Sequence, residues 1–65
     1  MFGVVKFYDA GKGFGFVDPG GGPDVFVHGS VLNRAGLAFL EPGQKVRVMV
    51  AQRNRGLQAT DIELL

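Results

Sequence analysis

The sequence predicts an all-β domain, in which five short antiparallel strands close into a barrel. Apolar residues alternate with other residues over several short runs, which is the period of a strand whose two faces differ. Glycine accounts for 11 of the 65 residues and disfavours helix. Gly36 and the pair Pro42-Gly43 interrupt the longest segment between strands, so no long helix fits there.

Five segments are rich in β-branched and aromatic residues and are bounded by turn residues. The expected strands are residues 2–8, 14–18, 24–28, 44–51 and 57–64. Residues 9–13 form a short turn, and the loop Pro19-Gly20-Gly21-Gly22-Pro23 cannot continue a ladder. The first three strands are therefore expected to form an antiparallel meander.

The connection between the third and fourth strands is the longest and least regular. Ser30 is a candidate cap for a short helical turn. Leu37, Phe39 and Leu40 are expected to fold back onto the barrel. On the fourth strand, alternation places three side chains on one face: Val46, Val48 and Val50. The fifth strand alternates less regularly and ends in apolar residues, which leaves its register open.

A five-stranded sheet of this size would expose two edges unless it closed on itself. The expected architecture is therefore a five-stranded antiparallel barrel of the oligonucleotide-binding (OB) type, with residues 1–65 as a single domain. A chain this short buries a modest core, so marginal stability is expected.

Two runs stand out, Lys12-Gly13-Phe14-Gly15-Phe16-Val17 and Val25-Phe26-Val27-His28. Alternate side chains of a strand share a face. If the runs pair, one face carries Phe14, Phe16, Phe26 and His28, and the other carries Val17, Val25 and Val27. The valines suit a core, which argues against the alternative that the phenylalanines are the core. So many rings on the outer face indicate a binding surface.

Composition excludes several other functions. Without cysteine there is no disulfide or thiolate metal site, and a single histidine cannot build a zinc site, so no metal or cofactor is expected. No serine, cysteine or acid is spaced to pair with His28, which disfavours an enzyme. The apolar runs are too short to cross a bilayer, and a cytoplasmic location is expected.

The formal net charge is only +1, so the distribution of charge matters more than its total. Lys6 and Lys12 flank the first aromatic run, and Arg55 follows in the turn before the last strand.

These residues resemble the cold-shock domain family of bacterial cold-shock proteins over nearly the whole chain. Lys12–Val17 resembles the first ribonucleoprotein-type motif of the family, and Val25–His28 resembles the second. Gly3–Tyr8 is similar to its opening stretch. Leu40–Gln44 is similar to the entry to its fourth strand, and Asn54–Ala59 to the start of its fifth.

The resemblance implies binding of single-stranded RNA or DNA, with unpaired bases stacked on aromatic side chains. The expected stacking residues are Phe14, Phe16, Phe26 and His28, extended by Phe7 and Tyr8. Lys6, Lys12 and Arg55 would contact phosphates. By resemblance, Asp24 would accept a hydrogen bond from a base edge. Strict alternation places Phe7 with the core residue Val5, so a bulge or a strong twist in the first strand is expected to bring its ring to the binding face.

The sequence also departs from the family pattern. The family usually has tryptophan, phenylalanine and asparagine where Phe7, Tyr8 and Asp9 stand, and it often has phenylalanine at the positions of Gly29 and Leu37. Fewer rings would weaken stacking. The expected role is that of an RNA chaperone or a regulator of transcription or translation, with a monomer favoured. The alternative is a protein-interaction module that uses the same aromatic face.

Overall fold

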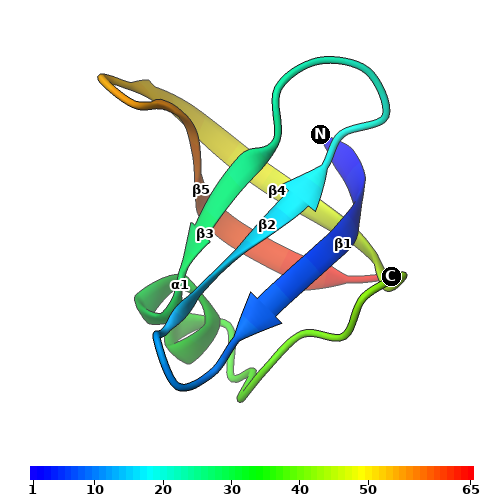
Figure 1. Ribbon diagram of the computed structural model, residues 1–65. Coiled ribbons are helices and arrows are strands. Elements are labelled where there is room, and N and C mark those ends of the chain that lie inside the picture. The colour runs from blue at the N-terminus through cyan, green and yellow to red at the C-terminus, as the bar shows by residue number, and fades with distance from the viewer.

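The computed structural model describes all 65 residues, which form five strands and one short helix around a closed barrel (Figure 1). The elements are β1 (Phe2–Asp9), β2 (Phe14–Asp18), β3 (Val25–His28), α1 (Gly29–Arg34), β4 (Lys45–Arg53) and β5 (Gly56–Leu64). Neighbours around the barrel follow the order β1-β2-β3-β5-β4. The predicted all-β barrel is therefore confirmed, with strand boundaries within two residues of those expected.

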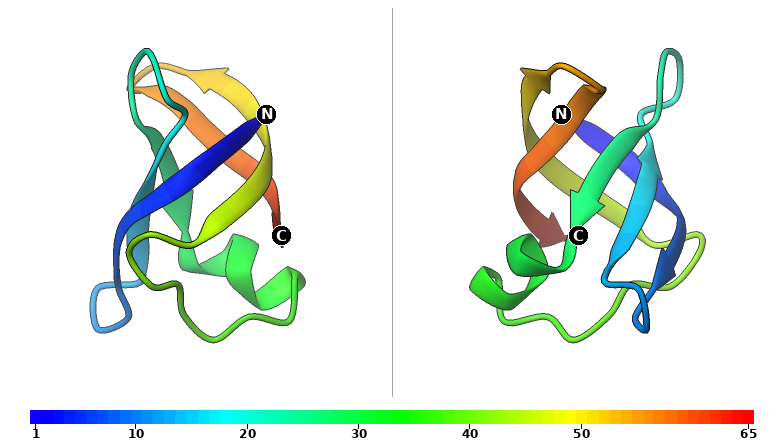
Figure 2. Two further views of the ribbon diagram at one scale, coloured as in Figure 1. Left: turned by 90° about the vertical axis from the view of Figure 1, so that its right-hand side faces the viewer. Right: turned by 60° about the vertical axis from the view of Figure 1, so that its left-hand side comes forward.

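All neighbouring strands are antiparallel except β3 and β5, which run parallel and are in register only at Phe26 and Gln58. The expected meander of the first three strands is present. α1 and the loop that follows it lie at one end of the barrel, while the β2–β3 loop and the β4–β5 turn lie at the other (Figure 2). No helix is long and apolar enough to cross a membrane.

The core is entirely aliphatic. Val17, Val25 and Val27 are completely buried, as the alternation of β2 and β3 predicts. The remaining core residues come from every other element and from the long loop: Val5, Val31, Leu32, Leu40, Val46, Val48, Ala59 and Ile62. Because the three valines fill the inner face of β2 and β3, the phenylalanines of these strands are left on the outer face.

Two bulges set which side chains face inward. In β1, Val5 lies opposite Val17 and Phe7 lies opposite Phe16, so Lys6 is an extra residue. This bulge turns Val5 into the core and Phe7 outward, which is one of the two expected ways of bringing Phe7 beside the other rings. A second irregularity, at Thr60 of β5, explains the poor alternation of that strand.

In the long connection between β3 and β4, the structure differs from two expectations. The residue that caps α1 is His28 rather than Ser30, because the Nδ1 atom of His28 accepts a hydrogen bond of 3.1 Å from the backbone N–H of Ser30. Leu40 is buried and Leu37 is half-buried against the core, as expected. Phe39 does not fold back, since 55% of its surface is exposed.

Candidate nucleic-acid interface

Five aromatic side chains form one continuous cluster on the outer face of β1, β2 and β3, called here the ring face: Phe7, Phe14, Phe16, Phe26 and His28. Phe14 and Phe26 are stacked, with ring centroids 5.7 Å apart and planes at 22°. Phe16 lies 5.7 Å from Phe26 and 5.6 Å from Phe7. Phe26 and His28 are 6.5 Å apart. The structure therefore brings together five of the six predicted stacking residues.

Strand register explains this arrangement. Phe16 lies opposite Phe26 on β3 and opposite Phe7 on β1, so three rings cross the sheet in one row. Phe14 lies opposite His28 in the next row. Side chains directly opposite one another in a sheet are close enough to pack. The rings thus support one another, which holds their positions while leaving part of their surface in solvent.

Gly15 permits the close approach of β1 and β2 behind the ring face. A Cβ atom at this position would lie 2.8 Å from the Cα atom of Tyr8 and would also run into the carbonyl oxygen of Phe7. Any side chain here would push β1 away from β2. Glycine at position 15 is therefore a packing requirement of the ring face rather than a flexible point.

Tyr8 does not belong to the ring face, which corrects the sequence-based expectation. Because the β1 bulge precedes Phe7, the next residue, Tyr8, lies opposite Gly15 and packs against the core cluster. Its hydroxyl lies near the junction of β3 and α1. The bulge that brings Phe7 outward therefore takes Tyr8 inward.

The ring of His28 is held by the start of α1. Its Nδ1 atom lies 3.1 Å from the backbone nitrogen of Ser30 and 3.0 Å from the Oγ atom of the same residue, so a serine does pair with His28, contrary to the sequence-based expectation. A neutral imidazole that accepts at Nδ1 carries its proton on Nε2. His28 therefore offers both a flat face and an N–H donor beside Phe26.

The three predicted cationic residues have different surroundings. Lys6 forms an ion pair of 2.8 Å with Asp24, whereas the side chain of Lys12 forms no ion pair. Arg55 lies beside the rings, where it lines a surface hollow together with Phe16, Phe26 and Gln58. Sequence reasoning missed Gln58, because its place beside Phe26 depends on the parallel contact that closes the barrel.

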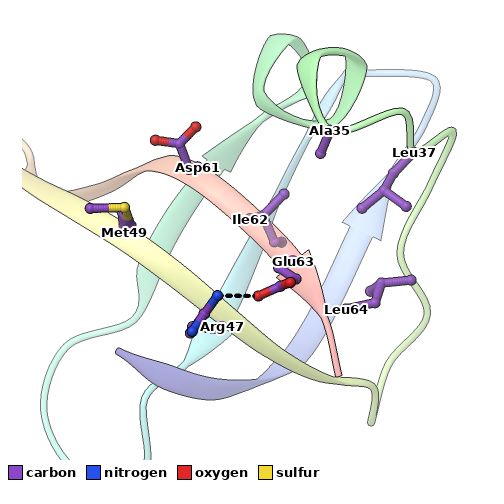
Figure 3. A pocket seen from close by; sticks show the side chains of 8 residues that line it. All are labelled: Ala35, Leu37, Arg47, Met49, Asp61, Ile62, Glu63 and Leu64. Atoms are coloured by element: carbon purple, nitrogen blue, oxygen red, sulfur yellow. Dashed lines mark ion pairs between the residues drawn. The ribbon is translucent and has the colours of Figure 1, made fainter.

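A second hollow lies among the loop after α1, β4 and β5 (Figure 3). It is lined by Ala35, Leu37, Arg47, Met49, Asp61, Ile62, Glu63 and Leu64. None of the five ring-face residues lines it. Arg47 is paired with Glu63 at 2.5 Å, with Asp61 also in the lining, so its cation is neutralised. This hollow lacks the combination of rings and free cations that suits a nucleic-acid strand.

Comparison with known proteins identifies the family. Residues 1–65 match the family described as the 'Cold-shock' DNA-binding domain. The chain belongs to this family. It is 47% identical to cold shock protein CspA of Staphylococcus saprophyticus over 60 residues, which cover 92% of this chain and 91% of the relative. It is 46% identical to cold shock protein CspC of Bacillus subtilis over 61 residues, or 94% and 92% of the two chains.

Membership of the cold-shock domain family confirms the resemblance inferred from the two aromatic motifs, and the family is one of nucleic-acid-binding domains. The roles of individual residues in this chain remain predictions. They concern the ring face itself and four charged side chains: Lys6, Lys12, Asp24 and Arg55.

Proposed function

We propose that this protein binds single-stranded RNA or DNA with little sequence preference, by stacking unpaired bases on the ring face. The observation that supports this most directly is the cluster of five rings on the outer side of an already complete aliphatic core. Every base has a flat face, so stacking tolerates any sequence. A duplex hides those faces, so it is expected to bind much more weakly.

Lys12 and Arg55 are the best placed cations for the phosphate backbone. Arg55 borders the rings directly, and Lys12 lies in the turn that leads into Phe14. Each phosphate contact releases counterions, so binding should weaken as salt rises. With a net charge of only +1, few such contacts are expected, and stacking carries a larger share of the affinity.

Binding of this kind would favour the open form of a structured RNA by mass action, because the protein lowers the free energy of the unpaired strand. The role proposed is that of a cytoplasmic RNA chaperone or a regulator of transcription or translation. The mechanism is binding alone, without catalysis.

Fluorescence anisotropy tests this proposal. A labelled pyrimidine-rich strand is titrated with protein at low and moderate salt, beside the same sequence as a duplex. The expected result is single-strand binding that weakens with salt and exceeds duplex binding. Absence of binding to either probe up to about 100 μM, the range of non-specific contacts, would contradict the proposal. It would favour the alternative, in which the ring face docks a protein in a salt-insensitive way.

A further inference from the structure

Three exposed apolar side chains lie together apart from the ring face, where β1 begins and the chain ends. Phe2, Val4 and Leu65 line one hollow, which contains none of the ring-face residues. Phe2 is 64% exposed and Leu65 is 68% exposed, although both side chains are large. Apolar side chains that gather on a surface mark contact sites, whereas single exposed ones need no explanation. These three residues are called here the terminal patch.

The strand geometry keeps the terminal patch in solvent. Gly3 faces the core, because a Cβ atom at this position would lie 2.6 Å from a buried side chain. Alternation therefore turns its neighbours, Phe2 and Val4, outward. Leu65 is held beside the start of β4 by a hydrogen bond of 3.1 Å from its N–H to the carbonyl oxygen of Lys45 (Figure 1). Because the barrel is closed, a partner must cover these side chains from outside rather than pair with a strand edge.

Opposite charges lie on the two sides of the terminal patch. Val4 is opposite Asp18 on β2 and opposite Lys45 on β4, so the three residues form one row across the sheet. Asp18 and Lys45 also line the hollow. Neither forms an ion pair within the chain, although Asp18 accepts a hydrogen bond from the backbone N–H of Gly20. The row therefore has a carboxylate at one end, an apolar centre and an ammonium at the other end.

Such a row is complementary to itself. A two-fold axis that lies in the contact plane, parallel to β1, exchanges the two sides of the row, so that Lys45 of each copy meets Asp18 of the other. The apolar centres meet at the axis. Pro19, which lines the hollow on the side of Asp18, would face Leu65 of the other copy. Apolar groups then meet apolar groups, and each charge meets the opposite charge.

We propose that the terminal patch is the contact surface of a homodimer, in which a second copy of this chain covers it by two-fold symmetry. This differs from the monomer expected from the sequence, and it does not depend on nucleic-acid binding. Exposed ion pairs contribute little affinity, so the charges set the orientation and the apolar side chains supply the affinity.

The size of the terminal patch sets the strength of the dimer. A stable dimer buries about 800 Å² per partner, which would be about a fifth of the 4176 Å² surface of this chain. The apolar part of the contact consists of only three side chains and Pro19. The dimer is therefore weak and forms at high protein concentration.

Sedimentation equilibrium measures this association. Between about 10 μM and about 1 mM protein, the average mass should rise toward twice that of the monomer. Phe2→Gln should raise the dissociation constant about tenfold, since it removes the largest apolar side chain of the terminal patch without touching the core. Phe39→Gln, the matched control, removes a similarly exposed ring from the long loop and should leave association unchanged. A protein that stays monomeric, or association that Phe2→Gln does not weaken, would overturn the inference.

Charge reversal tests the orientation. Asp18→Lys and Lys45→Asp should each abolish self-association, because each brings like charges together across the axis. Mixed with one another, the two variants should form a heterodimer in which both charge contacts are attractive. Asp61→Lys mixed with Arg53→Asp carries the same charge changes outside the contact and should associate no more strongly than the unmodified protein. Absence of the heterodimer from folded variants would overturn the inference; if either variant does not fold, the result with Phe2→Gln decides.

NMR distinguishes a second copy from other occupants of the terminal patch. The signals of Phe2 and Leu65 should shift as the protein concentration rises, without any ligand. In dilute, monomeric protein, an added oligothymidine strand should leave these signals in place. Shifts caused by the strand under these conditions would assign the patch to nucleic acid and overturn the inference.

Discussion

The hydroxyl of Tyr8 lies 3.0 Å from the position that a Cβ atom would take on Gly29. The carbonyl oxygen of Gly13 lies 3.1 Å from the same position and accepts a hydrogen bond from the N–H of Gly29. Glycine at position 29 is thus fitted to tyrosine at position 8. Tyr8 in β1 and Gly29 at the start of α1 both depart from the usual family pattern, and the two residues are linked by this packing.

Gly29→Phe would add the ring that the family often has, but the structure predicts a loss of stability of about 1–3 kcal/mol, because the new side chain crowds the Tyr8 hydroxyl. That hydroxyl forms no hydrogen bond with another protein group, so Tyr8→Phe alone should be nearly neutral. Combining the two should recover at least half of the loss. Urea unfolding of the four proteins measures this coupling. No recovery would mean that the carbonyl oxygen of Gly13 causes the crowding.

Phe14→Ala with Phe26→Ala should reduce single-strand affinity by about 1–3 kcal/mol for each base that loses its stacking partner. The fold should survive, because neither ring belongs to the buried core. Anisotropy titration and circular dichroism measure the two effects. Phe2→Ala is the matched control, since it removes an exposed ring that forms no aromatic pair with the ring face. Unfolding of the double variant would show that the rings are needed for the fold.

Gly15→Ala should destabilise the protein by about 1–3 kcal/mol and also weaken single-strand binding, because the added methyl group separates β1 from β2 and displaces Phe7. Gly11→Ala is the control, as its methyl group would meet only a side-chain oxygen of Asp9. Thermal unfolding and anisotropy report the two effects. Unchanged stability in Gly15→Ala would contradict the close approach of the two strands.

The ion pair of Lys6 predicts a pH effect at the alkaline end. Because the hydrogen bond and charge of Asp24 raise the pKa of Lys6, the stabilisation from this pair is complete below the ordinary lysine pKa and is lost as the pH rises through the raised value. NMR titration of the lysine side chains should show that Asp24→Asn lowers the pKa of Lys6. A pKa that is unchanged in this variant would contradict the pairing.

Much of the fold follows from local patterns in the sequence. The alternation in β2 and β3 predicts both the buried valines and the outer rings, since inner and outer positions exchange at every residue. The expected placement of Tyr8 beside the rings was wrong because adjacent residues of a strand face opposite sides, so Phe7 and Tyr8 do not both point outward. The extra residue Lys6 exchanges the inner and outer positions of all residues of β1 that follow it. Strict alternation does not reveal where in the strand this exchange occurs.

Features that depend on distant parts of the chain could not be predicted in this way. The position of Gln58 beside Phe26 depends on the contact between β3 and β5. The pairing of Lys6 with Asp24 depends on the distance between β1 and β3, which β2 separates. The exposure of Phe39 depends on the path of a loop without periodic structure. The cap of α1 was assigned to Ser30 because serine is a common cap, whereas the histidine side chain two residues earlier accepts the hydrogen bond.

The parallel contact between β3 and β5 joins the barrel at one pair of residues, whereas β4 and β5 are paired along their whole length. Local opening of a protein begins where few interactions must break. Local opening at this contact would separate Arg55 and Gln58 from the two rings that line the same hollow, Phe16 and Phe26. The β1–β3 meander, which carries the rings, would not be disturbed. Opening of this contact alone would therefore widen the hollow that lies between these two pairs of residues.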